Sequence, residues 1–147
     1  MASGTLYGQT FTGQYSATAA RRVDWVTDTI KITLHTSSYT PNRDTHVFFS
    51  DATNELTTGG GYTAGGQALG TKSVSYDATT HQTRLIAADP SWTSATFACR
   101  YALVWKDTGT STTSPLIGYI DLGAQSITGG TFTVDLDQTL GVFNIAA

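Results

Sequence analysis

The sequence predicts an all-β chain, and three features support that prediction. Thr makes up roughly a fifth of the 147 residues and charged residues only 13 %, whereas Leu, Ala and Gly usually lead and about a quarter of residues are charged. Thr has a branched Cβ that suits strands, and its hydroxyl tolerates water. Apolar residues recur at every second position in several segments, which is the period of a half-buried strand. Links rich in turn residues separate these segments, as in a β-sandwich or jelly-roll.

The N-terminal segment is the one region whose spacing indicates a helix. Within residues 7–25, aromatic and small apolar residues recur every four positions from Tyr7 to Ala19 and would share one helical face. Two glycines and several threonines in the same segment weaken a helix. We therefore expect a single domain over 1–147, with an N-terminal helix or arm over 1–23 and a β-sandwich over 24–147.

The first clear strand covers residues 30–35. Ile30, Ile32 and Leu34 alternate with more polar residues, so these three side chains are expected on the inner face and Thr33 and His35 on the outer face. Two further segments, SVSYD at 73–77 and HQTRLIAAD at 81–89, are joined by a three-residue link. This short spacing predicts a β-hairpin.

The C-terminal half carries the strongest apolar runs. TFACRYALVWKD at 96–107 is apolar on both alternating faces, which predicts a central strand between two layers. Strands are also expected at 116–123 and at 131–137, where Phe132, Val134 and Leu136 face inward. The links between these elements are the polar segment 107–115 and the Gly129–Gly130 pair. A last strand is expected within LGVFNIAA at 140–147.

A glycine-dense stretch, GGGYTAGGQALGTKS at 59–73, is close to a phosphate-binding loop. That motif requires Lys directly after its second glycine, but Thr71 lies between Gly70 and Lys72. The motif also requires a strand before the loop and a helix after it, whereas this stretch precedes the predicted strand at 73–77. We therefore interpret it as a long exposed crossing between strands, anchored by Tyr62.

The residues that could carry chemistry do not form a recognisable motif. The single cysteine, Cys99, lies in an apolar run and is expected to be a buried thiol. Asp44, His46 and Asp51 are one candidate set of metal ligands. A metal site needs three or four converging ligands, so we interpret these residues instead as polar loop residues that form local turn hydrogen bonds.

Catalytic arrangements have equally little support. A Ser-His-Asp triad remains open, because such triads are assembled in space rather than in sequence, but the chain has no GxSxG elbow. Glu55 is the only Glu, so no carboxylate pair for glycoside hydrolysis is indicated. We expect a protein that is not an enzyme and binds no cofactor or metal.

Charge and hydropathy limit the classes of partner that the chain can bind. The formal net charge is −3, and the eight Lys and Arg residues are spread along the chain, which argues against a nucleic-acid-binding face. No run approaches the roughly 18 apolar residues of a membrane span, and residues 1–11 do not resemble a signal peptide. Three Trp and seven Tyr residues leave open a carbohydrate-binding surface. Trp105 is expected in the core, whereas Trp92 follows a turn and is the candidate for exposure.

Several blocks of the sequence are similar to one known family. They are SSYTPNRDTH at 37–46, GYTAGG at 61–66, WTSAT at 92–96 with RYALVWKDTG at 100–109, and PLIGYIDLG at 115–123. In this order they resemble small virion-associated proteins of tailed bacteriophages.

The resemblance implies a virion structural protein that is made in the host cytoplasm. Its implied role is capsid decoration, with the major capsid protein or other virion subunits as partners. The chain is expected to form a homo-oligomer, a trimer. A tail, neck or fibre component and a host-surface carbohydrate-binding module are the alternatives. Loops would make the contacts, and the candidate contact residues are Tyr39, Arg43, His46, Tyr62 and Trp92.

Overall fold

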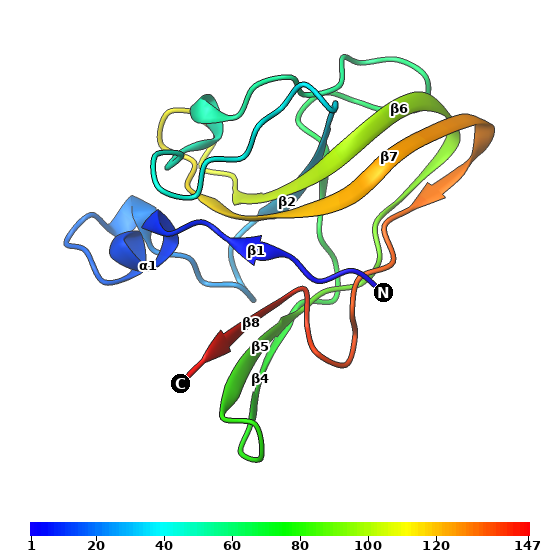
Figure 1. The fold of residues 1–147 in the computed structure, drawn as a ribbon. Helices are drawn as coiled ribbons and strands as arrows, with labels where there is room; N and C mark the ends of the chain where they lie inside the picture. Colours follow the sequence, from blue (N-terminus) through cyan, green and yellow to red (C-terminus); the bar gives the residue numbers. More distant parts are fainter.

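The computed structural model describes residues 1–147 and is all-β, with two antiparallel sheets and one short helix (Figure 1). The larger sheet has the strand order β1-β7-β6-β2-β3, and its strands are β1 (Thr5–Leu6), β2 (Ile30–His35), β3 (Gln67–Ala68), β6 (Ser91–Lys106) and β7 (Leu116–Thr133). The smaller sheet has the order β4-β5-β8, and its strands are β4 (Ser73–Asp77), β5 (Gln82–Ile86) and β8 (Phe143–Ala146). The fold class predicted from the sequence is therefore confirmed.

Strand β6 lies between β7 and β2 and divides the core in two. Ala102 and Val104 belong to a main cluster of 19 buried residues, which also includes Phe143 of the smaller sheet. Leu103 and Trp105, on the opposite face, belong to a second cluster of five. The prediction of a central strand that is apolar on both faces is confirmed, because each face packs against its own layer.

Strand β2 is buried on both faces, although its alternation predicted only one buried face. Ile30, Ile32 and Leu34 lie in the main core as predicted. Thr33 and His35 were expected to face solvent, but both are fully buried. The reason is local pairing: the His35 ring hydrogen-bonds the Thr33 hydroxyl at 3.0 Å and the Thr53 carbonyl at 2.7 Å, so the loop after β2 covers this face.

Strands β6 and β7 form one long curved ribbon, the most extended feature of Figure 1. A turn was expected at Gly129–Gly130, but β7 continues through this pair to Thr133. Because β6 begins at Ser91, five residues earlier than expected, its added residues pair with Gly130, Phe132 and Thr133. Register shifts near Ala95 absorb the glycine pair as a bulge.

The smaller sheet confirms the predicted hairpin and the predicted last strand. Strand β4 pairs with β5 from Ser73 opposite Ile86 to Asp77 opposite Gln82. Strand β8 pairs with the other edge of β5. In Figure 1 this sheet extends below the long ribbon, and the chain ends beside it.

The N-terminal helix is much shorter than the sequence spacing suggested. Helix α1 covers Gln9–Gln14 only, and a separate 3-10 turn, η1, covers Ala19–Arg21. Tyr7 lies before the helix and is buried, whereas Tyr15 is almost fully exposed, so the predicted single apolar face does not exist. Strand β1 pairs with β7 and fixes this segment to the larger sheet. A second 3-10 turn, η2, covers Phe49–Asp51, and no helix is long and apolar enough to span a membrane.

The glycine stretch has neither neighbour that a phosphate-binding loop needs, since β4 follows it. Tyr62 anchors the stretch, as predicted: its hydroxyl donates to Glu55 Oε1 at 2.7 Å and accepts from the Leu34 N–H at 3.2 Å. Two glycines lie directly on strand backbone, because a Cβ at Gly60 would overlap the Thr96 carbonyl and one at Gly66 the Ile32 carbonyl. The stretch is therefore pressed against the larger sheet.

Candidate contact surface

The most distinctive surface feature is an open cavity of about 530 Å³ between the N-terminal segment and the smaller sheet. We call it the apolar groove. One wall comes from α1 and the following residues, the floor from β1, β7 and the turn around Trp25, and the other wall from all three strands of the smaller sheet. Nine of its 13 lining residues are hydrophobic, among them Leu6, Phe11, Tyr15, Trp25, Val74 and Ile145.

The first wall is held in place although its helix is short. The Thr10 hydroxyl donates to the Ile117 carbonyl of β7 at 3.0 Å, which fixes the start of α1 to the larger sheet. Gln14, the last residue of α1, accepts the Val23 N–H on its side-chain oxygen at 2.7 Å. These two bonds leave Phe11 and Tyr15 on the groove side.

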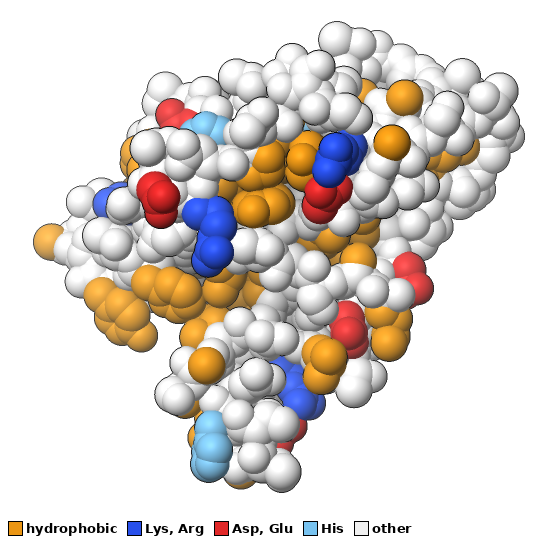
Figure 2. Space-filling model, viewed as in Figure 1, with side chains coloured by type: hydrophobic (Ala, Val, Ile, Leu, Met, Phe, Trp, Pro, Cys, Tyr) orange, Lys and Arg blue, Asp and Glu red, His pale blue; other side chains and the backbone are white.

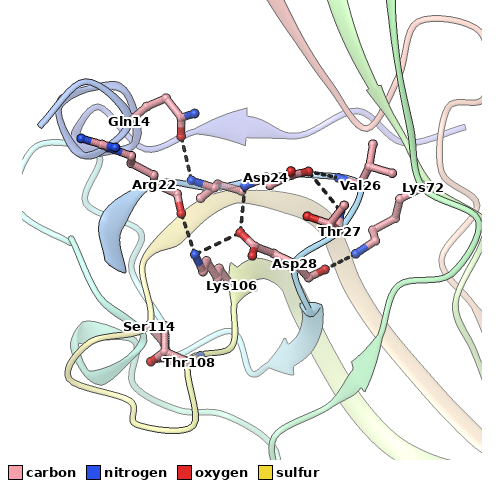
Figure 3. A network of polar contacts seen from close by, with 11 residues as sticks. Gln14, Arg22, Asp24, Val26, Thr27, Asp28, Lys72, Lys106, Thr108 and Ser114 are labelled. Atoms are coloured by element: carbon pink, nitrogen blue, oxygen red, sulfur yellow. Dashed lines mark hydrogen bonds and ion pairs between the residues drawn. The ribbon is translucent and has the colours of Figure 1, made fainter. Parts of the chain in front are cut away.

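The floor is held by polar contacts around the turn before β2 (Figure 3). The Asp28 carboxylate accepts the Asp24 N–H at 2.8 Å and pairs with Lys106 Nζ at 3.0 Å. Lys72 donates to the Asp28 carbonyl, which ties the approach to β4 to the same turn. The turn thereby presents Trp25, whose Nε1 donates to the Ile86 carbonyl of β5 at 2.9 Å.

The second wall is one face of the smaller sheet. Because opposed residues of an antiparallel pair point to the same side, Val74, Leu85 and Phe143 share this face. Tyr76, Thr83 and Ile145 form the next row of the same face. Phe143 is buried against Trp25 in an edge-to-face contact with ring centroids 6.2 Å apart. Away from this contact, Val74 is 48 % exposed and Tyr76 57 % exposed.

The groove is almost uncharged. Residues 1–20 contain no charged side chain, and Asp24 is the only charged residue in the lining. Its carboxylate accepts the N–H groups of Thr27 and Val26 at 3.0 Å, and these hydrogen bonds hold the pKa of Asp24 below its usual range. This carboxylate is thus already used within its own turn, and the open part of the groove offers mainly apolar contact.

Exposed apolar side chains gather beside this groove. Figure 2 shows hydrophobic side chains next to α1 and in the hollow that leads toward the smaller sheet. Tyr15 is 87 % exposed, and Phe11 is partly exposed next to it. Isolated apolar residues are ordinary on a protein surface, whereas a contiguous patch around a hollow is typical of an interaction site.

The predicted contact loop at 37–46 is closely attached to its own chain. Tyr39 is buried, and its hydroxyl hydrogen-bonds the Tyr7 hydroxyl at 2.6 Å and His46 Nδ1 at 2.9 Å. Arg43 Nε donates to the Leu6 carbonyl at 3.1 Å. Arg43 is exposed and His46 half-buried, so these two side chains stay candidates for a partner contact, but Tyr39 does not reach the surface.

Tyr62 and Trp92 also lie inside the chain. Trp92 was expected to be exposed but is only 6 % exposed. It packs against Tyr62 and Phe132, with ring centroids 6.2 and 6.0 Å apart. Trp92 is buried because β6 begins at Ser91, which makes Trp92 a strand residue whose side chain points into the core.

The other candidate residues are also placed by the structure. Cys99 is buried, as predicted, and burial raises the pKa of its thiol to about 11. Asp51 accepts the N–H groups of Val47 and Phe48 at 2.8 and 2.9 Å, which is a local turn bond. No group of three or more His, Cys, Asp or Glu side chains converges as a metal site would require. Asp44 and His46 thus do not form such a group with Asp51.

The residues of the apolar groove were not among the candidates predicted from the sequence. The spacing predicted one helical face for Phe11 and Tyr15, and 73–77 was recognised as a strand without an exposed apolar face being assigned to it. One signal was available, since the uncharged N-terminal twenty residues are unusual for a surface segment. Which strand face stays open depends on how the sheets pack, and alternation alone does not show that.

Comparison with known protein families, characterised proteins and solved structures finds no match for this chain.

Proposed function

We propose that this chain is a structural protein of a tailed-bacteriophage virion that decorates the capsid by non-catalytic contacts. The observation that carries the proposal is the apolar groove, an almost uncharged hollow bordered by exposed aromatic side chains. Interface centres are depleted in charge and enriched in Tyr, Trp and Phe. The resemblance of the blocks at 37–46, 61–66, 92–109 and 115–123 to phage virion proteins supports the virion part of the proposal.

The proposed mechanism is burial of the groove and its rim against a neighbouring virion subunit. Phe11 and Tyr15 on one wall and Ile145 on the other would enclose apolar side chains of that subunit. Each large side chain that leaves water contributes about 1.5–3 kcal/mol, and a few such residues dominate a typical interface. The rest of the domain would hold the two walls of the groove at a fixed separation.

Immunogold labelling of intact virions tests this function. Antibody against this chain should label the heads, and virions from a phage that lacks the gene should carry no label. Label confined to the tail or the neck would replace decoration with the tail, neck or fibre alternative. Virions free of label, from a phage that expresses the chain, would overturn the virion role altogether.

A carbohydrate-binding role is the second candidate, and the exposed Tyr15 and Tyr76 favour it. Tyrosine rings can stack on sugar faces. Tyr15 lines the apolar groove, and Tyr76 is exposed on the groove-facing side of the smaller sheet. Trp92 no longer supports this role, because it is buried. A glycan array separates the candidates: binding that is lost in Tyr15→Ser would favour sugar recognition, and an array without signal would remove it.

A further inference from the structure

Strand β4 leaves one edge of the smaller sheet without a partner. It pairs with β5 alone, and it lies at the end of the order β4-β5-β8. Every residue from Ser73 to Tyr76 is exposed. A free strand edge presents backbone N–H and C=O groups that can pair with another chain.

The alternation of the sheet shows which backbone groups of β4 are free. On the β8 side of β5, the Leu85 carbonyl accepts the Val142 N–H and the His81 carbonyl accepts the Ala147 N–H. Backbone groups of successive residues in a strand point to opposite edges, so Arg84 points toward β4 and pairs with Ser75. The backbone groups of Val74 and Tyr76 therefore point outward, away from β5.

The same two residues carry the exposed apolar side chains of this strand. Val74 and Tyr76 both lie on the groove-facing side of the sheet. Natural edge strands are usually protected by being very short or by carrying Pro or charged residues. Strands β1 and β3, at the edges of the larger sheet, have only two residues each, whereas β4 has five and no Pro or Lys among them.

We propose that β4 pairs with β4 of a second copy of this chain, antiparallel, about a two-fold axis at Ser75. This inference concerns contact between copies and goes beyond the proposed attachment to the virion. In this register, Val74 lies opposite Tyr76 of the second copy, and both residues have outward backbone groups. Two such pairs give four main-chain hydrogen bonds. A two-fold contact uses the same patch on both copies, and only this register pairs all five residues of the strand.

The side chains of this register are compatible with the pairing. On one face, each Val74 meets Tyr76 of the second copy, an aromatic to β-branched pair of the kind that stabilises sheets. On the other face, Ser73 lies opposite Asp77 of the second copy, so no like charges oppose each other. Because five-residue strands make a small contact compared with the standard ~800 Å² per partner, the dimer is expected to be reversible.

Cysteine cross-linking tests the register. Ser75 lies at the two-fold axis as a non-hydrogen-bonded pair, whose Cα atoms are about 4.5 Å apart, within the range that a disulfide spans. Treated with diamide as oxidant, Ser75→Cys should give a covalent dimer in high yield. The matched control is Asn144→Cys, which places a thiol on the polar face of β8, at the other edge of the same sheet. The native Cys99 is buried and should not interfere.

Sedimentation velocity with proline variants tests the hydrogen bonds. The N–H groups of Val74 and Asn144 both point to free edges, so Val74→Pro and Asn144→Pro each leave the monomer's ladder intact. The wild type and Asn144→Pro should associate as concentration rises, and Val74→Pro should remain monomeric, with circular dichroism confirming that both variants fold. A wild type that stays monomeric at about 1 mM, or equal cross-linking of Ser75→Cys and Asn144→Cys, would overturn the proposal. These measurements need no virions, so their failure would leave the proposed attachment intact.

Discussion

The larger sheet is buried on both faces along β2 and the second half of β6, whereas the smaller sheet leaves much of β4 in solvent. On the first, apolar side chains fill two clusters, and the buried polar groups of Thr33, His35 and Tyr62 have hydrogen-bond partners. On the second, Val74 and Tyr76 lie uncovered beside the apolar groove. This difference indicates that the larger sheet provides most of the stability of the domain, whereas the open face of the smaller sheet is free for contact.

Truncation of one aliphatic side chain in each sheet should give the largest contrast. Leu34→Ala removes a fully buried residue of the main core and should lower the free energy of unfolding by about 2–5 kcal/mol, because it leaves a cavity. Val74→Ala in the smaller sheet should change it by less than about 0.5 kcal/mol. Urea denaturation measures both, and similar losses would show that the smaller sheet carries as much stability as the larger.

A pair of hydroxyl deletions sharpens the comparison. Tyr62→Phe removes the donor to Glu55 and the acceptor of the Leu34 N–H. It should cost about 1–3 kcal/mol, since buried polar groups lose their partners. Tyr76→Phe removes a hydroxyl whose contact with His81 is exposed and should be nearly neutral. Thermal unfolding of the two variants gives the difference, and a neutral Tyr62→Phe would remove the anchor role assigned to Tyr62.

The pH dependence of stability should report on His35. Burial lowers the pKa of His35 below its usual value of 6.5, so the unfolded chain takes up a proton at a pH where the folded chain does not. Stability is therefore complete above about pH 6.5 and falls as the pH drops toward the folded pKa, by at most about 1.4 kcal/mol per pH unit. The carboxylates with lowered pKa values, such as Asp107 and Asp121, change the stability only near and below pH 3.8.

Denaturation at pH 7 and pH 5 measures this effect. The wild type should lose stability between the two, and His35→Gln, although less stable at pH 7, should show a flatter profile. An unchanged slope in that variant would mean that other groups cause the acid sensitivity.

The sequence predicted most of the strands, because alternation is a local signal. Residues 30–35, 73–77 and the central run near 96–107 were recognisable from their own side chains. What failed depended on distant partners. Gly129–Gly130 stays within a strand because β6 extends back to Ser91 to pair with it, and His35 is buried because the loop near Thr53 covers it.

The candidate contact residues show the same limit. Tyr39, Tyr62 and Trp92 are large aromatic residues in polar segments, and such residues can face a partner or pack within the chain. The structure packs all three. The most exposed aromatics are instead Tyr15 and Tyr76, which lie in segments predicted as a helix or arm and as a strand. Only the relative placement of the two sheets shows which apolar face is left uncovered.

The most direct test of the account is attachment of purified variants to virions that lack this chain. Tyr15→Ser changes a residue that is 87 % exposed at the groove, and Leu140→Ser changes one that is 46 % exposed away from it. Both variants should fold with wild-type stability, within about 0.5 kcal/mol.

Tyr15→Ser should attach at least about tenfold more weakly, a loss of about 1.4 kcal/mol, while Leu140→Ser attaches like the wild type. Wild-type attachment by Tyr15→Ser, and likewise by the double variant Phe11→Ser with Tyr15→Ser, would contradict the claim that the apolar groove is the contact surface.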